Sequence, residues 1–136
     1  MPQSVQHICM ADDDPDDYYL FETALKEVND SVKLTWFNTC DGLLEFLKSS
    51  DDLPDIIVLD MNMPGNNGNA CLLSLKTEAR LHHIPVIIYS TSGTPGIIKK
   101  AQESGAFNYY VKPHSIQHIK ELIKEILTTP VSDVKK

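Results

Sequence analysis

The fold of this chain is decided by residues 56–65, whose sequence is IIVLDMNMPG. An apolar, mostly β-branched run of this kind is typical of a strand that is buried on both faces of a parallel sheet. Asp60 ends the run, and because burying an unpaired charge is costly, we expect it at the carboxyl edge of the sheet, within reach of water and ions. Met63, Pro64 and Gly65 follow as turn residues and place Asp60 at the mouth of a loop. An Asp at a strand end is by itself more often a helix cap or a loop acid, so the interpretation depends on the other strands.

Length and composition predict one domain. The chain has 136 residues, of which 42% are hydrophobic, enough for a real core. We expect the domain to span residues 5–128, with a polar tail over residues 129–136. The net charge of -7 argues against nucleic-acid binding. No apolar stretch approaches the roughly 18 residues of a membrane span, and the first residues do not resemble a signal peptide, so a cytoplasmic location without membrane contact is expected.

The three cysteines are expected to be reduced packing residues. Cys9, Cys40 and Cys71 are an odd number, are widely spaced and lie in apolar or ordinary helical surroundings. Their spacing does not match that of metal ligands. We therefore predict neither a disulfide nor a metal site from them.

Four further strands are predicted, and three of them also end in polar side chains. The run 7–11 leads into Asp12, Asp13 and Asp14, the run 85–89 leads into Ser90, and the run 107–111 leads into Lys112. Residues 32–37 alternate between apolar and polar, which is typical of a half-exposed strand near a sheet edge.

Helices are predicted between the strands from helical spacing and from start and stop signals. Pro15 and Pro95 suit the first turns of two of them, Asp41 opens a third, Asn69 is a candidate cap for the fourth, and Gly105 closes the helix that begins at Pro95. The predicted helices cover residues 15–30, 41–47, 70–75, 95–105 and 116–127. Ile97 and Ile98 fit either a dimer face or the core.

Five alternations of strand and helix predict an α/β fold, a doubly wound (βα)5 parallel sheet. Its simplest strand order is 2-1-3-4-5. In that order the first and third strands are neighbours, so Asp12, Asp13 and Asp60 converge at one crevice. Ser90 and Lys112 close the same edge.

This edge carries the parts of a phosphoryl-transfer site. Three neighbouring carboxylates repel one another unless a cation lies among them, and oxygen ligands suit Mg²⁺ or Mn²⁺. A carboxylate beside such an ion can act as a nucleophile toward phosphorus, giving an aspartyl phosphate. The ammonium of Lys112 and the hydroxyl of Ser90 would stabilise the transferred oxygens.

Four motifs together resemble the receiver domains of two-component response regulators. They are ADDDP at 11–15, LDMNMPG at 59–65, YST at 89–91 and YYVKP at 109–113. The resemblance covers about residues 5–128 and implies a flavodoxin-like, CheY-like fold. It implies that Asp60 is the phosphoacceptor, that Asp13 binds the metal directly, that Asp12 holds it through water and that Asn62 offers its backbone carbonyl. It further implies that Ser90 is the switch hydroxyl, that Lys112 pairs with the phosphoryl group and that Tyr109 is the rotating aromatic; the alternative for Tyr109 is a ring that simply packs at the sheet edge.

The chain departs from the family pattern in two places. Thr91 stands where many receivers have Ala, and its bulk would narrow the route for water or for the phosphodonor. Asn67 and Gly68 replace a common Asp-Gly pair, a change that still suits a turn. The triple acid at 12–14 also leaves its register to be decided, and the spacing from the strand favours Asp12 and Asp13 as the metal pair.

The resemblance implies a response regulator, and because the tail after Leu127 is too short for another domain, we expect a single-domain one. A histidine kinase or a histidine phosphotransfer protein would be the phosphodonor, and the domain would catalyse only its own phosphorylation and dephosphorylation. The surface of the fourth helix, fifth strand and fifth helix would change conformation on phosphorylation and bind a downstream protein. The receiver itself would be a monomer or a weak phosphorylation-dependent dimer.

Three alternatives are weighed against this function. A flavodoxin-like electron carrier shares the strand order, but Asp12 to Asp14 would repel a flavin phosphate. A magnesium-dependent aspartyl-phosphate phosphohydrolase normally has a second acid two residues after its nucleophile, where this chain has Asn62. A receiver fold that no longer accepts phosphate is the third, although every expected acid is present.

Overall fold

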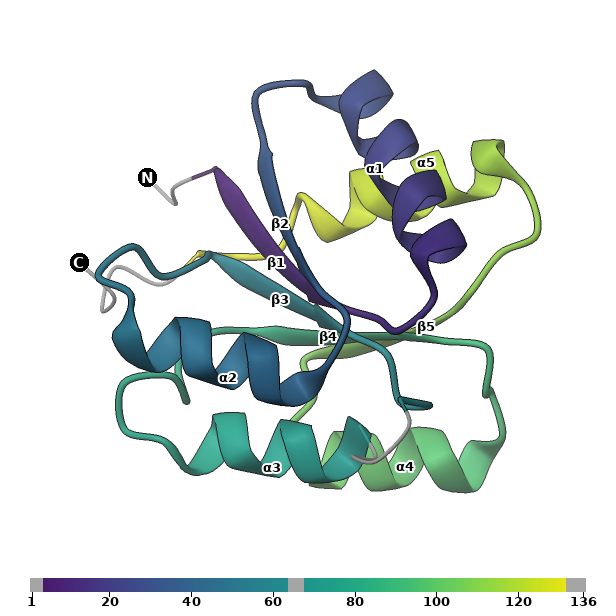
Figure 1. The fold of residues 1–136 in the computed structure, drawn as a ribbon. Coiled ribbons are helices and arrows are strands. Elements are labelled where there is room, and N and C mark those ends of the chain that lie inside the picture. Colours follow the sequence, from purple (N-terminus) through teal and green to yellow (C-terminus); the bar gives the residue numbers. More distant parts are fainter. Residues whose placement is uncertain (1–3, 64–67, 132–136) are drawn as a thin grey trace.

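The computed structural model describes residues 4–63 and 68–131. Its strands are β1 (His7–Ala11), β2 (Lys33–Phe37), β3 (Ile56–Leu59), β4 (Val86–Ser90) and β5 (Asn108–Val111). Its helices are α1 (Pro15–Val28), α2 (Cys40–Ser49), α3 (Gly68–Thr77), α4 (Pro95–Glu103) and α5 (Ile116–Ile126). The strand pairs are parallel and the sheet order is β2-β1-β3-β4-β5 (Figure 1). The predicted doubly wound α/β fold is confirmed.

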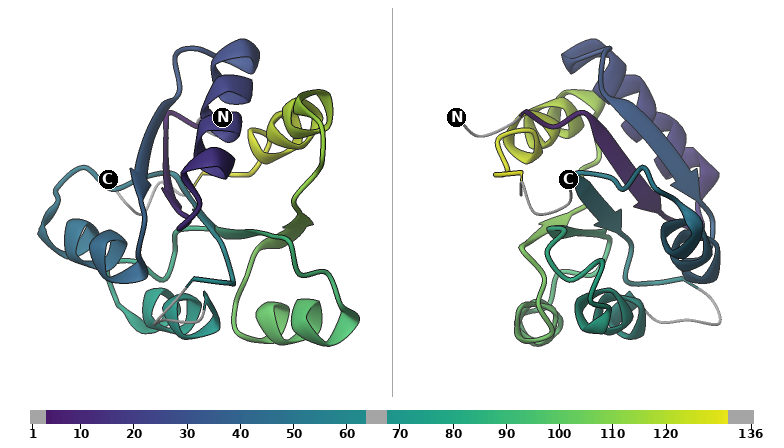
Figure 2. Two further views of the ribbon diagram at one scale, coloured as in Figure 1. Left: turned by 45° about the vertical axis from the view of Figure 1, so that its right-hand side comes forward. Right: turned by 90° about the vertical axis from the view of Figure 1, so that its left-hand side faces the viewer.

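Helices cover both faces of the sheet. Helices α1 and α5 pack side by side on one face, and α2, α3 and α4 lie on the other (Figures 1 and 2). The side chains of β3 alternate between the two cores, with Ile56 and Val58 facing the first pair and Ile57 and Leu59 facing the other three. This is why the sequence of β3 is apolar throughout.

The acids that follow β1 and β3 lie at the same level of the sheet. Ala11 of β1 pairs with Leu59 of β3, and the N–H of Asp60 donates to the carbonyl of Ala11 over 3.0 Å. Because both faces of β3 are apolar, a shift of this strand by one residue would leave its apolar residues buried. A shift that moved Asp60 into the sheet would be unfavourable, because burying an unpaired carboxylate costs several kcal/mol. The strand ends therefore align their acids at one edge.

The edge strand and the helix ends agree with the sequence, with two corrections. Strand β2 is half-exposed at the sheet edge, as its alternation indicated. Helix α2 begins one residue before Asp41, because the side chain of Thr39 caps it by accepting from the N–H of Gly42. Helix α3 already includes Gly68, so Asn69 lies inside the first turn and is not its cap.

In α4, Ile97 is exposed and Ile98 is only partly buried, so neither belongs to the buried core. Ala101 is the buried residue of this helix.

The expectation for the cysteines was wrong for two of the three. Cys40 and Cys71 form a disulfide, with their Cα atoms 6.0 Å apart, and Cys9 is a buried free thiol. The two partners are separated by 31 residues in sequence. They meet because the first residue of α2 and the first turn of α3 lie beneath the same face of the sheet, a proximity that spacing along the chain does not reveal.

The described chain stays packed to its last residue. Thr129 and Val131 are buried, and Val131 joins the core between the sheet and the α1–α5 pair, so the expected polar tail begins later than residue 129. The rest of that tail and the loop residues 64–67 lie outside the described residues. Within residues 4–63 and 68–131, every helix is too short or too polar to traverse a bilayer.

Candidate functional site

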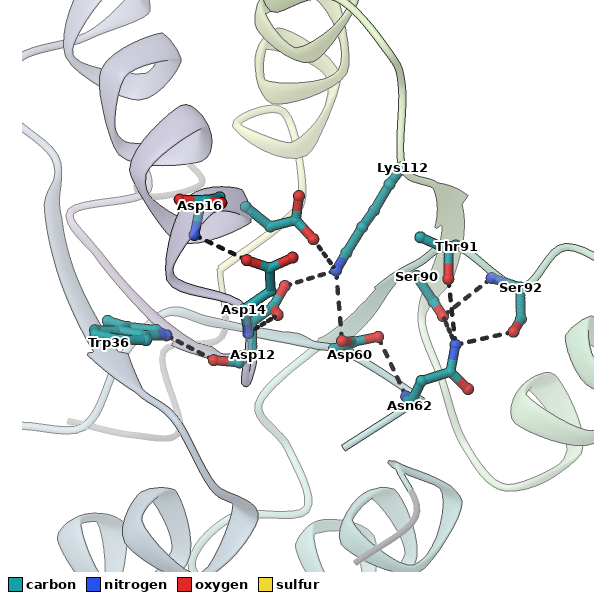
Figure 3. Close-up of polar contacts among 11 residues, drawn as sticks. Asp12, Asp14, Asp16, Trp36, Asp60, Asn62, Ser90, Thr91, Ser92 and Lys112 are labelled. Carbon is teal, nitrogen blue, oxygen red and sulfur yellow. Dashed lines mark hydrogen bonds and ion pairs between the residues drawn. The ribbon is translucent and has the colours of Figure 1, made fainter. Parts of the chain in front are cut away.

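Three carboxylates meet where β1 and β3 end. Asp12 and Asp13 follow β1, Asp60 follows β3, and one oxygen of each lies within 4.8 Å of the others. Asp12 and Asp60 are buried. Figure 3 shows both side chains directed to the same point above the sheet edge. The convergence expected from the strand order is thus present in the structure.

Asp14, the third acid of the triplet, is used by helix α1. Its side chain accepts from the N–H of Asp16 over 2.9 Å and caps the helix, with Pro15 in the first turn. Its own N–H donates to Asp12 Oδ1 over 2.9 Å and so helps to hold that side chain. Asp14 therefore lies outside the cluster, and Asp12 and Asp13 are the two acids of this loop that join Asp60.

Asp12 is held in a position that favours a cation. Burial raises the pKa of Asp12 to about 6, although the N–H of Asp14 and the Lys112 ammonium act in the opposite direction. Its Oδ2 atom is buried and lies 2.9 Å from Lys112 Nζ, its ion-pair partner. A buried carboxylate next to two further acids fits a divalent ion with oxygen ligands.

Lys112 brings the positive charge. It follows β5, its side chain is buried, and its Nζ atom lies 3.4 Å from Asp60 Oδ2 and 2.7 Å from Asp17 Oδ2. Burial alone lowers the pKa of Lys112, but its contacts with Asp17 and Asp12 outweigh burial, so the pKa is raised above its ordinary value. The side chain is therefore an ammonium at neutral pH, and Figure 3 shows it reaching across the edge toward Asp60.

An amide and hydroxyl network closes the other side of Asp60. The Asn62 side chain donates to Ser90 Oγ and Thr91 Oγ1, each at 3.3 Å, and to Ser92 Oγ at 2.9 Å (Figure 3). The N–H of Asn62 donates to Asp60 Oδ1 over 3.2 Å. The network joins the loop after β3 to the end of β4 and to the loop that follows it.

Two cavities open near this edge, and one of them contains the acids. Asp13, Asp17, Asp60, Asn62, Thr91 and Lys112 are among the residues that line an open cavity of about 370 Å³. A cavity of about 410 Å³ between α3 and α4 is lined largely by apolar side chains, including Leu73 and Ile97. The carboxylates and the Lys112 ammonium line the 370 Å³ cavity, so we assign the functional site to that cavity.

Comparison with known proteins decides the family. A family model described as the response regulator receiver domain matches residues 8–124. This chain belongs to the response regulator receiver family. It is 33% identical over 123 residues to the two-component response regulator ORR8 of rice (Oryza sativa subsp. indica), covering 90% of this chain and 99% of that protein. It is 30% identical over 112 residues to sporulation initiation phosphotransferase F of Bacillus subtilis, covering 82% of this chain and 89% of that protein.

Solved structures show the same receiver fold. The Mn²⁺-bound form of the response regulator Rcp1 superimposes with a TM-score of 0.84 at 21% identity, over 93% of this chain and 99% of that one. The phosphorylated cyanobacterial phytochrome response regulator RcpA gives a TM-score of 0.82 at 23% identity, over 90% and 91% of the two chains. Receiver domains accept a phosphoryl group on an Asp in two-component signalling and take it from histidine kinases or phosphotransfer proteins.

Tyr109 of this receiver domain faces the hydroxyl network. Its ring is half-buried against the core of α2, α3 and α4, and its hydroxyl donates to the backbone carbonyl of Ser92. The Tyr109 hydroxyl thus contacts the loop that directly follows Ser90, the last residue of β4. The rotation of this ring stays a prediction.

Two residues of the site were missed by sequence reasoning. Asp17 contacts Lys112, and Trp36 donates from its indole nitrogen to the backbone carbonyl of Asp12 over 2.8 Å. A usable signal existed for Asp17, since it lies in the first turn of the helix that directly follows the acidic loop. No local signal marks Trp36, because it is on a neighbouring strand.

Proposed function

We propose that Asp60 accepts a phosphoryl group from a phosphohistidine, with Mg²⁺ or Mn²⁺ held by Asp12, Asp13 and Asp60. The observation that carries the proposal is the placement of one buried carboxylate, Asp60, within 4.8 Å of two others and 3.4 Å from a buried ammonium. With an ion bound, a carboxylate in such a place would have a divalent cation on one side and a charge-stabilising donor on the other. The combination suits an acceptor of an anionic group better than a structural ion pair.

In the proposed transfer, an oxygen of Asp60 forms a bond to phosphorus and the N–P bond of the phosphohistidine breaks. The histidine nitrogen keeps the electron pair, and because the other ring nitrogen of the phosphohistidine carries a proton, the leaving group is a neutral imidazole. When bound, the divalent ion would neutralise the charge of the acids and of the transferred oxygens. Asp13 would bind it directly, Asp12 would hold it through water, and Asn62 would offer its backbone carbonyl.

Lys112 and Ser90 would bind the transferred oxygens. The ammonium of Lys112 is already 3.4 Å from Asp60, and Ser90 Oγ now accepts from the Asn62 side chain and, over 3.3 Å, from the N–H of Ser92. A phosphoryl group on Asp60 would accept a hydrogen bond from the O–H of Ser90, which uses its oxygen as an acceptor in the present contacts. Thr91 lines the same cavity and would restrict access to the phosphorus atom.

We propose that the output surface is formed by α4, β5 and α5. Movement of Ser90 toward the phosphoryl group would shift the loop before α4, to whose Ser92 carbonyl the Tyr109 hydroxyl is bonded. Exposed large apolar side chains support this surface: Ile97 on α4, Val111 on β5 and Ile116 on α5 are all solvent-accessible. A downstream protein would bind there, and comparing the mass in solution with and without beryllofluoride shows whether a dimer forms instead.

The test uses acetyl phosphate or beryllofluoride with Mg²⁺. A receiver gains one stable adduct, which mass spectrometry of the acetyl phosphate product places at a single Asp; a phosphohydrolase turns over substrate, and an electron carrier binds flavin. Asp60→Asn should abolish the adduct, while Asp16→Asn, a change in an exposed acid of α1, should leave it. An adduct that survives Asp60→Asn would refute the assignment of the acceptor.

A further inference from the structure

The Lys112 ammonium has three carboxylate neighbours of unequal kind. Asp17 Oδ2 lies at 2.7 Å, Asp12 Oδ2 at 2.9 Å and Asp60 Oδ2 at 3.4 Å from Nζ. Asp12 and Asp60 belong to the acid cluster, whereas Asp17 does not. The shortest contact of the ammonium is therefore with the acid outside the cluster.

A cation bound by Asp12, Asp13 and Asp60 would change the contacts of the Lys112 ammonium; this step rests on the function proposed above. The ion would attract Asp12 and Asp60, the same carboxylates that now contact the ammonium, and it would repel the ammonium directly. Asp17 lies on α1, outside the acid cluster, so its ion pair with Lys112 would remain when Asp12 and Asp60 bind the ion. Without Asp17, the ammonium and the ion would compete for the same oxygens.

We propose that Asp17 is a positioning residue that retains the Lys112 ammonium beside Asp60 while a divalent cation occupies Asp12, Asp13 and Asp60. The ammonium and the ion then hold opposite sides of Asp60 at the same time, as phosphoryl transfer requires. Asp17 touches neither the ion nor the phosphoryl group in this arrangement. It acts through Lys112.

A purely local role for Asp17 does not account for the contact. An acid in the first turn of a helix is favoured by the helix dipole, and Asp16 serves that role equally. Asp16 is exposed and has no ion-pair partner within residues 4–63 and 68–131, whereas the Asp17 side chain is 28% exposed and reaches Lys112, 95 residues away in sequence. Asp16→Asn is thus a matched control, since it removes the same charge from the same turn.

The test measures Mg²⁺ binding by titration calorimetry on the unphosphorylated protein. Asp17→Asn should raise the Kd for Mg²⁺ about tenfold, because the freed ammonium then competes for Asp12 and Asp60; Asp16→Asn should raise it by less than about threefold. Asp17→Glu, which can still reach Lys112, should restore most of the affinity. Thermal unfolding is recorded for each variant, and if Asp17→Asn is unfolded at the assay temperature, Asp17→Ser removes the same charge in its place.

A double-mutant cycle with Lys112→Met separates positioning from the loss of charge. If Asp17 acts through Lys112, the effect of Asp17→Asn on the Kd should shrink several-fold when Lys112 is already Met. The same factor in both backgrounds would mean that Asp17 contributes only its charge, and the positioning role would be overturned while the cation site stands. If neither the original protein nor Asp16→Asn binds Mg²⁺, the proposed cation site fails and this inference fails with it.

Discussion

The indole nitrogen of Trp36 donates a hydrogen bond to the backbone carbonyl of Asp12 over 2.8 Å. The indole ring also stacks on Tyr18 of α1, with ring centroids 4.5 Å apart and planes 5° from parallel. Trp36 therefore joins the edge strand, the first helix and one carboxylate of the acid cluster. Because Asp12 would contribute to a cation site, a bound ion would change the electrostatic surroundings of the indole.

Trp36 should report cation binding, because it is the only tryptophan in the chain. We expect Mg²⁺ to change the intensity or the wavelength of its fluorescence emission, saturably and with the Kd found by calorimetry. Asp13→Asn should shift the titration to higher Mg²⁺ concentration without removing the fluorophore. A calorimetric binding curve with no matching fluorescence change would contradict the coupling between Trp36 and Asp12.

Asp12→Asn should stabilise the fold at neutral pH when divalent ions are absent. Burial raises the folded-state pKa of Asp12 to about 6 from the ordinary 3.8, so between these values the folded protein binds more protons than the unfolded chain. The free energy of unfolding therefore falls as the pH rises through this window, and Asn, which does not titrate, escapes the loss. Lys112 keeps Asp17 as a partner.

Urea unfolding in EDTA measures this effect. At pH 7.5 we expect the free energy of unfolding of Asp12→Asn to exceed that of the original chain by about 1 to 3 kcal/mol, and the difference to shrink as the pH falls toward 4. Asp16→Asn serves as the exposed control and should not stabilise. A loss of stability in Asp12→Asn at pH 7.5 would mean that its contact with Lys112 outweighs the cost of burial.

Gly68→Ala should disturb the acceptor loop. A Cβ atom at position 68 would lie 2.4 Å from Met61 Cα and 2.7 Å from the carbonyl oxygen of Asp60, so backbone must move. We expect a loss of about 1 to 3 kcal/mol in the free energy of unfolding and a slower gain of the Asp60 adduct. Gly96→Ala is the control, because no atom lies within 4 Å of its added Cβ. On helix propensity it should stabilise α4 by up to about 1 kcal/mol. Equal adduct rates in the two variants would show that the close approach at Gly68 is unimportant.

Thiol counting tests the cysteine pairing. Without reductant, the native protein should show no rapidly reacting thiol, because Cys9 is buried and burial raises its pKa to about 12. Denaturation should expose one thiol, and denaturation with reduction should expose three. Reduction should lower the free energy of unfolding by roughly 3 to 4 kcal/mol, the chain-entropy value for a loop of this length. Three thiols in the denatured, unreduced protein would refute the Cys40–Cys71 pair.

The strands and the acids at their ends could be predicted from the sequence. The apolar run before Asp60, the shorter run before Asp12 and the half-exposed pattern of β2 are local features, and each resolves to the expected place in the sheet. Parallel strands bring their carboxyl ends to one edge, so the meeting of Asp12, Asp13 and Asp60 follows from strand order alone. Helix ends were less exact, since capping by Thr39 displaced α2 by one residue.

Only the tertiary structure decided which distant side chains meet. Asp17 and Lys112 are 95 residues apart, Cys40 and Cys71 are 31 apart, and Trp36 and Asp12 are 24 apart. Hydrophobic periodicity tells which face of an element is buried, because that depends on the backbone repeat of the element itself. It does not tell how a helix is rotated and shifted against its neighbours, which is set by the packing of side chains from several elements at once. The sequence alone thus determined a parallel sheet with acids at one edge. The packing of the elements decided that Asp17 of α1 pairs with Lys112 and that a disulfide joins α2 to α3.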